Sequence, residues 1–165
     1  MTVVVGVGDA TGSRTAIEYA ATEARYRGTP LAAVMAYHEE TSLGAPAGRP
    51  LGTLQTGADR RQSAAELLRL AVSDALADAA GEVDLRVVAG PPGRVLVDAA
   101  SELDADLVVL ATRGDGRVTR LLGTVNQFVL RNSPCPVLVV PETTARRPGV
   151  RARRARRPGY RRYGR

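Results

Sequence analysis

Apolar residues gather along this chain in short runs that predict five strands separated by helical stretches. The runs are rich in valine and leucine and contain few polar positions, which is typical of parallel strands covered on both faces. They occupy residues 3–7, 31–37, 85–89, 106–111 and 137–140. This alternation of strand and helix predicts an α/β fold rather than an all-α or all-β fold.

Helical periodicity fills the intervals between the strands. Ser13 is placed to cap the first helix, which Gly28 ends. A long second helix closes at Gly81, and a third helix follows a Pro-Pro-Gly turn. Thr124, with Gln127 three residues later, predicts a capping box at the start of the fourth helix. The apolar faces of the four helices are expected to consist of positions 17, 20, 21 and 24; 64, 67, 68, 71, 72, 75, 76 and 79; 95, 96, 99, 100 and 103; and 125, 128 and 129.

The predicted fold class is therefore α/β, three-layered and Rossmann-like, with a five-stranded parallel sheet and four helices on its two faces. In such sheets, ligands bind beyond the carboxyl ends of the strands, near the point where the strand order reverses. Those ends carry residues 8–12, 36–38, 90–93 and 111–116, and glycine occurs in all but the second. We expect these segments to converge on one edge of the sheet.

Glycines before the fourth helix form a pattern suited to binding an anion. Gly114, Gly116 and Gly123 lead from a buried strand to a helix start, where backbone N–H groups and the positive end of the helix dipole attract phosphate. Arg113 and two further arginines add positive charge. The chain contains no lysine, so this segment is not a Walker A loop. The alternative is a tight strand-to-helix turn that binds no ligand.

Charge divides the chain into an acidic body and a basic tail. The formal net charge is +6, but ten arginines and no acid lie between Arg146 and Arg165. The preceding residues then hold 13 arginines against 17 acids, a net charge of −4. We expect residues 144–165 to be a disordered Arg-rich tail. It either contacts nucleic acid or another polyanion through Arg–phosphate pairs, or is a solvated extension without a partner.

No arrangement of residues indicates catalysis. His38 is the only histidine and is expected in a solvated loop, and no His, Cys or acidic cluster has metal-ligand spacing. Cys135 is the only cysteine and is expected to be a buried structural thiol, which favours a reducing compartment. The chain has no apolar run long enough to cross a membrane. We therefore expect a cytoplasmic binding protein rather than an enzyme.

Several blocks of the sequence resemble the universal stress protein family. They are the opening VVVGV, the helix start at Ser13, the run ADLVVLATRG, and the closing block LLGTVNQFVLRNSPCPVLVVP. The resemblance covers residues 2–141 and assigns residues 1–143 to one domain. It implies the strand order 3-2-1-4-5, homodimers formed through the strand from Val137 to Val140, and binding of ATP or AMP, with Mg²⁺ where ATP binds.

This chain departs from the nucleotide motif of the family, in which Gly, two residues, Gly and nine residues precede Gly-Ser/Thr. Ala111 stands at the first glycine, and eight residues separate Gly114 from Gly123. Gly8 stands where the family has a first-strand aspartate, although Asp9 follows directly. The resemblance implies a nucleotide site at the following positions: Gly8, Asp9, Ala36, Ala111, Arg113, Gly114, Gly123, Thr124, Val125 and Asn126.

Two functions from different classes therefore remain open. The first is a stress or regulatory protein that binds an adenine nucleotide between the fourth strand and the fourth helix. The second is a nucleotide-free dimeric interaction module, whose basic tail contacts a polyanion.

Overall fold

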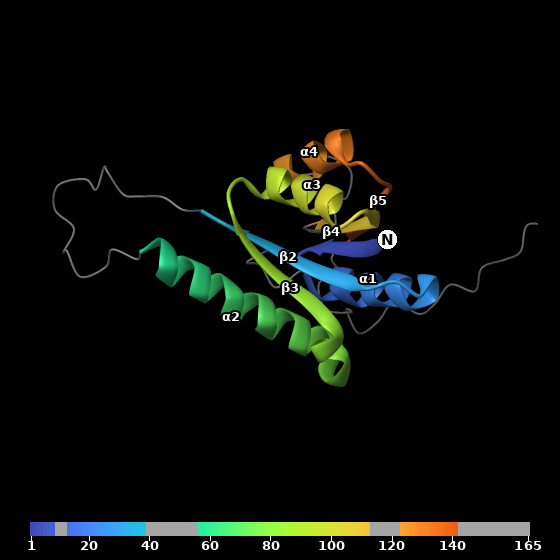
Figure 1. Cartoon of the computed structure of the whole chain (residues 1–165), viewed down its shortest axis with the longest axis horizontal. Helices are drawn as coiled ribbons and strands as arrows, with labels where there is room; N and C mark the ends of the chain where they lie inside the picture. Colours follow the sequence, from blue (N-terminus) through green and yellow to red (C-terminus); the bar gives the residue numbers. More distant parts are fainter. Residues whose placement is uncertain (9–12, 39–55, 113–122, 142–165) are drawn as a thin grey trace, which may run out of the picture.

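The computed structural model describes residues 1–8, 13–38, 56–112 and 123–141, and within these the side chains of all residues except 78 and 79. A parallel five-stranded sheet runs through the middle of the molecule (Figure 1). Its strands are β1 (Thr2–Gly6), β2 (Leu31–Tyr37), β3 (Val83–Ala89), β4 (Ala105–Thr112) and β5 (Val137–Pro141). They are ordered β3-β2-β1-β4-β5, which confirms the predicted order and fold class.

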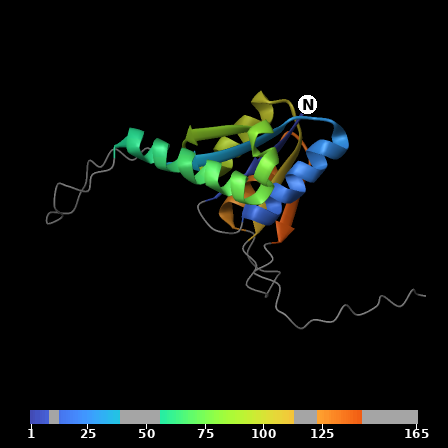
Figure 2. The same ribbon diagram turned by 90° about the horizontal axis from the view of Figure 1, so that it is seen from below.

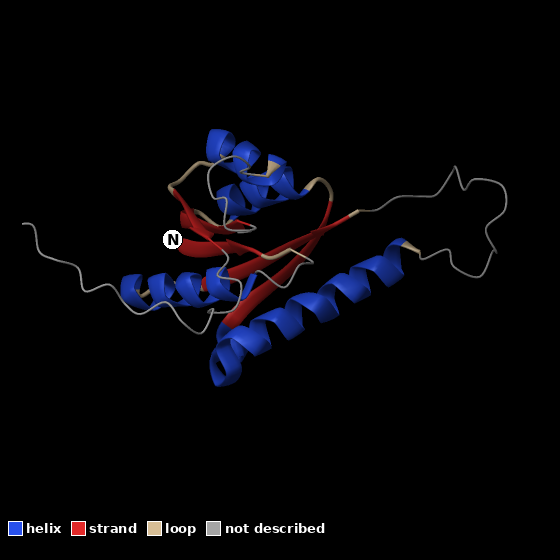
Figure 3. Ribbon diagram, turned by 180° about the vertical axis from the view of Figure 1, so that it is seen from behind, coloured by secondary structure: helices blue, strands red, loops and turns tan. Residues whose placement is uncertain are grey.

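Helices cover both faces of the sheet, because the strands carry apolar side chains on both faces. One face carries α1 (Ser13–Arg27) and α2 (Gly57–Leu76), and the other carries α3 (Pro92–Glu102) and α4 (Thr124–Asn132) (Figures 1 and 3). A 3-10 segment, η2 (Ala77–Glu82), joins α2 to β3. Figure 2 shows α1 and α2 side by side over the sheet.

The core consists of two hydrophobic clusters that the sheet separates. Val3 and Val5 of β1 point into the cluster beneath α1 and α2, whereas Val4 points into the cluster beneath α3 and α4. All three valines are fully buried. At about 25 cal/mol per Å² of apolar surface, burying side chains of this size stabilises the fold by roughly 1.5–3 kcal/mol each. The continuous apolar run in β1 thus follows from its having a helix on each side.

The second helix is shorter than predicted and buries a narrower face. It ends at Leu76 rather than at Gly81, because Ala77 adopts a positive φ of 46° and the chain continues as the 3-10 segment η2. Leu67, expected inward, is 47% exposed, while Leu68 is fully buried. The helix lies over β2 and β3 at one edge of the sheet, so only a narrow stripe of it is covered.

Helix caps also differ from the predictions. Gly123 occupies the N-cap of α4 without a side-chain hydrogen bond, and Thr124 is already the first helical residue, so the capping box predicted at Thr124 is wrong. A capping box that the prediction lacked begins α2, where Thr56 and Asp59 hydrogen-bond each other's backbone N–H groups. Gly28, with a φ of 64°, ends α1 as predicted.

Candidate functional site

The carboxyl ends of β1 and β4 lie next to each other at the point where the strand order reverses. The two strands pair in parallel, with Val5 opposite Val109. After β1 the chain enters α1 on one face of the sheet, and after β4 it enters α4 on the opposite face. Open α/β sheets bind ligands at such a switch point. The predicted site residues that the structure describes fall on these two strand ends, on the neighbouring end of β2 and at the start of α4.

The β1 side of the site is tied to α1 by a buried hydroxyl. The backbone N–H of Gly8 donates to Oγ of Ser13 over 3.2 Å. Ser13 is 6% exposed and is the first residue of α1 rather than its N-cap, so the helix begins close to the predicted position while the hydroxyl accepts from the segment after β1. Gly8 is exposed beside this contact. Asp9, the expected carboxylate, lies outside the described residues.

The β4 side is tied to α4 by a buried amide. Nδ2 of Asn126 donates to the backbone carbonyl of Ala111 over 3.1 Å, and Asn126 is 8% exposed. Ala111 itself is half-buried and packs against the cluster beneath α1 and α2. Its carbonyl is thus engaged by protein. Arg113 and Gly114, the next predicted site residues, lie outside the described residues.

The amino end of α4 presents its first-turn backbone to the rim of the sheet. Gly123 and Thr124 are exposed, and Val125 is half-buried. The first intrahelical bond runs from the N–H of Gln127 to the carbonyl of Gly123 over 3.1 Å, which leaves the N–H groups before it without an intrahelical acceptor. No acidic residue lies in the first turn. This end of α4 is therefore suited to attract an anion.

Ala36 lies apart from these groups, near the end of β2. It pairs with Val88 of β3 and packs against the cluster beneath α3 and α4. β2 neighbours β1 in the sheet, so Ala36 lies two strands from Ala111. It has no polar side chain and can contribute shape or backbone contacts alone.

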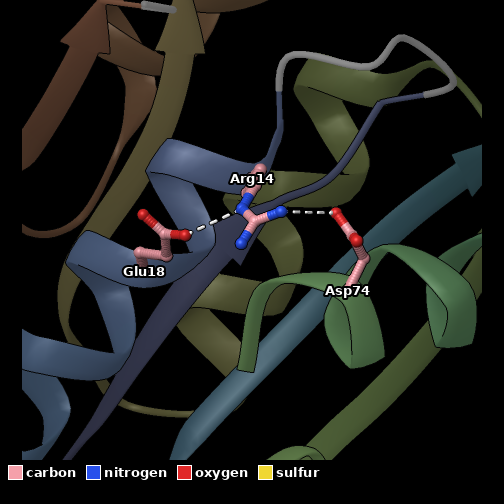
Figure 4. Close-up of polar contacts among 3 residues, drawn as sticks. All are labelled: Arg14, Glu18 and Asp74. Atoms are coloured by element: carbon pink, nitrogen blue, oxygen red, sulfur yellow. Dashed lines mark hydrogen bonds and ion pairs between the residues drawn. The ribbon is translucent and has the colours of Figure 1, made fainter. Parts of the chain in front are cut away.

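An exposed ion pair joins α1 to α2 close to the start of α1 (Figure 4). Nε of Arg14 lies 2.9 Å from Oε1 of Glu18, and Nη1 lies 3.2 Å from Oδ2 of Asp74. The hydrogen bond with Glu18 and the charge of Asp74 raise the pKa of Arg14. The guanidinium thus bridges Glu18 on its own helix and Asp74 on α2. The sequence signal for the first contact was the i, i+4 spacing, but no local pattern marks Asp74 as the second partner.

Cys135 is less buried than expected, whereas His38 is exposed, as expected for a solvated loop residue. Cys135 is half-buried and packs against the cluster beneath α3 and α4, with its backbone N–H donating to Oγ of Ser133. His38 is exposed, and its carbonyl accepts from Arg60. Within the described part of the chain, no group of three or more His, Cys, Asp or Glu residues could hold a metal ion.

Comparison with known proteins decides the family. A sequence profile described as the universal stress protein family matches residues 1–141. The chain belongs to this family. A universal stress protein of Thermus aquaticus is 33% identical over 140 residues, covering 84% of this chain and 97% of that protein.

The universal stress proteins that this chain matches include longer proteins and a protein crystallised with a ligand. One from Mycobacterium tuberculosis is 30% identical over 140 residues, which are 84% of this chain but 46% of that protein. The chain therefore spans about half the length of the mycobacterial relatives it matches. The crystal structure of a universal stress protein in complex with cAMP is 29% identical, with a TM-score of 0.64 over 87% of this chain and 98% of that one.

The family assignment leaves some expectations of the sequence untested. The tail from residue 144 to residue 165 lies outside the described residues, as do Gly116 and the arginines near it. No helix among residues 13–27, 57–76, 92–102 and 124–132 is long and apolar enough to cross a membrane. Sequence reasoning missed the two buried contacts of Ser13 and Asn126, because each joins residues that no helical or strand period relates.

Proposed function

We propose that this universal stress protein domain binds an adenine nucleotide, AMP or ATP, at the switch point between β1 and β4. The supporting observation is the open amino end of α4, with N–H groups that have no intrahelical acceptor and no acidic side chain in the first turn. The 29% identical universal stress protein bound to cAMP supports an adenine nucleotide as the ligand class.

The phosphates lie against the backbone of Gly123, Thr124 and Val125 in this proposal. The adenosine lies toward the ends of β1 and β2, near Gly8 and Ala36. Where ATP binds, Mg²⁺ accompanies the triphosphate and neutralises part of its charge. We propose binding rather than catalysis, because the sequence has no serine in a nucleophile-elbow context. The single cysteine favours a cytoplasmic setting.

Calorimetric titration of the full chain with AMP, and with ATP and Mg²⁺, tests this proposal. We expect saturable heat with either ligand. Purified protein that retains nucleotide should also absorb more ultraviolet light than the polypeptide alone, because adenine absorbs there. The chain contains no tryptophan to mask that signal. A dissociation constant of about 1 mM corresponds to a binding free energy near −4 kcal/mol. Absence of heat with both ligands at about millimolar concentration would therefore overturn nucleotide binding.

Gly123→Val is a sharp variant for the same site. Among the described residues, a Cβ at Gly123 meets no atom within 4 Å, and the φ of −53° suits any residue, so this variant should fold. Its side chain would occupy the space where the phosphates lie and should abolish binding. Gly81→Val is the matched control, because Gly81 also has open space but precedes β3 at the opposite end of the sheet. Equal affinity of the two variants would contradict the placement at α4.

A second candidate function is a nucleotide-free module that acts as a homodimer. β5 is an edge strand of the sheet, and Val137, Leu138 and Val139 on it are only half-buried. Unpaired edge strands readily pair with another chain. A protein that dimerises but gives no heat with nucleotide would favour this function over the first.

The basic tail adds a separate proposal, contact with nucleic acid or another polyanion. Its ten arginines without an acid between Arg146 and Arg165 support this contact. A salt-dependent gel shift with duplex DNA is expected. Deletion of residues 146–165 should remove the shift, and an unchanged shift after deletion would contradict the proposal.

A further inference from the structure

Three polar side chains are buried among the described residues, namely Thr2, Ser13 and Asn126. Two of these three, Ser13 and Asn126, each bond to the carboxyl end of a strand at the switch point. Burying a polar group is costly unless it is hydrogen-bonded, so such groups are held by a specific partner. The partner of Asn126 is the backbone of a residue assigned to the nucleotide site.

Asn126 occupies a helical position where packing alone would favour another residue. It lies in the first turn of α4, next to the fully buried Val129. Asparagine is a poor helix former, and a buried apolar side chain would stabilise this position without an amide to satisfy. The described contact of the amide is the hydrogen bond from its Nδ2 to the carbonyl of Ala111, 3.1 Å away and 15 residues earlier in the chain.

That bond joins the last residues of β4 to the first turn of α4. Ala111 is held in the sheet by its pairing with Val140 of β5, so its carbonyl is a fixed point. A bond from this point to Asn126 fixes the start of α4 relative to the sheet. The direction of the first-turn N–H groups of Thr124 and Val125 is then fixed as well, and an anion site depends on amide direction.

A similar bond follows the neighbouring strand β1, but there the backbone donates and the side chain accepts. Gly8, two residues after the end of β1, donates its N–H to the hydroxyl of Ser13 in the first turn of α1. On both strands of the switch point, one buried polar side chain of the following helix therefore bonds to the backbone of the strand end.

We propose that Asn126 is a positioning residue of the nucleotide site, acting through the carbonyl of Ala111 rather than by contact with the ligand. This inference rests on the proposed function, since it names how the site at α4 is held. The family resemblance places Asn126 among the residues of the nucleotide site, whereas this inference gives it an indirect role.

The first arm of the test needs no nucleotide. Amide hydrogen exchange of the full chain is compared for wild type, Asn126→Ala and Asn132→Ala. The control is matched, because Nδ2 of Asn132 also donates to a backbone carbonyl, that of Phe128 at 2.7 Å, but at the other end of α4. Exchange at the amide of Gln127 should become about fivefold faster in Asn126→Ala, as expected for one lost hydrogen bond, and stay unchanged in Asn132→Ala.

The second arm measures affinity for AMP by calorimetry, well below the melting temperature of each variant. Asn126→Ala should bind at least about tenfold more weakly, while Asn132→Ala binds like wild type. If Asn126→Ala fails to fold, Asn126→Leu replaces it, since leucine has the same number of heavy atoms and fills the space without a donor. A purely structural role would lower the stability of the Asn126 variants without this selective loss of affinity.

The outcomes separate this inference from the proposed function. If wild type gives no heat with AMP or ATP, nucleotide binding itself fails. If wild type binds, but the Asn126 variants bind equally well, the positioning role is overturned while the proposed function stands. Faster exchange together with weaker binding, confined to the Asn126 variants, supports the role.

Discussion

The ring of Phe128 on α4 lies directly against Gly93 on α3. A Cβ built on Gly93 would be 2.9 Å from Cδ1 of Phe128 and 3.1 Å from its Cβ, closer than carbon atoms pack. Gly93 is buried in the first turn of α3. The two helices can therefore approach each other at this point because residue 93 has no side chain.

Gly93→Ala should consequently destabilise the domain. Overpacking of this kind costs about 1–3 kcal/mol, and the higher helix propensity of alanine returns at most about 1 kcal/mol. We expect a net loss of about 1 kcal/mol in the free energy of unfolding, measured by urea denaturation. Gly81→Ala is the control, because a Cβ there meets no atom within 4 Å. A Gly93→Ala variant as stable as wild type would contradict the close packing of α3 on α4.

The buried face of α2 gives a second prediction. Leu68 is fully buried against the sheet, whereas its neighbour Leu67 is 47% exposed. Leu68→Ala should cost about 2–5 kcal/mol, from lost apolar burial and the cavity it leaves. Leu67→Ala should cost less than about 1 kcal/mol. Equal losses in urea denaturation would mean that the covered stripe of α2 is wider than the structure has it.

Most of the fold could be predicted from the sequence because its signals are local. Runs such as residues 106–111 are apolar throughout, and only a strand between two helix layers needs that pattern. The inward face of α2 was predicted too wide, because leucines at 67, 68 and 70 surround the helix axis. Which of them is covered depends on how far α2 overlaps the sheet, and the helical period contains no information about that overlap.

The candidate site was harder to predict because its polar contacts are not local. Asn126 was assigned to the ligand, yet its amide donates to Ala111, a partner 15 residues away. Ser13 was expected to cap its own helix, yet its hydroxyl accepts from Gly8, two residues after the preceding strand. The cap at Thr56 was visible as Thr-x-x-Asp in the sequence, but it follows a long segment without periodicity and was overlooked.

That cap gives a third prediction, a dependence of stability on pH. The backbone N–H and the hydroxyl of Thr56 both donate to the carboxylate of Asp59, at 2.9 and 2.8 Å, and lower its pKa. A carboxylate with a lowered pKa contributes stability above its unfolded pKa of about 3.9. This contribution is lost as the pH falls through the lower pKa of the folded state.

The thermal midpoint of wild type should therefore exceed that of Asp59→Ala near neutral pH. The difference should shrink as the pH falls below about 4, because protonation removes the charge that the Thr56 donors stabilise. Thermal unfolding followed by circular dichroism at several pH values measures it. A difference that stays constant from neutral to acid pH would show that the cap of α2 does not depend on the ionised carboxylate.

The two edges of the sheet give the last prediction, which tests the proposed homodimer. Val139 on β5 and Val88 on β3 are valines on opposite edge strands, and neither is fully buried. A lysine on an edge strand opposes pairing with another chain, since its charge would have to be desolvated. If the dimer forms through β5, Val139→Lys should yield a monomer, while Val88→Lys remains dimeric. Light scattering after size-exclusion chromatography measures the mass of each, and a dimer lost in Val88→Lys but kept in Val139→Lys would place the interface at β3 instead.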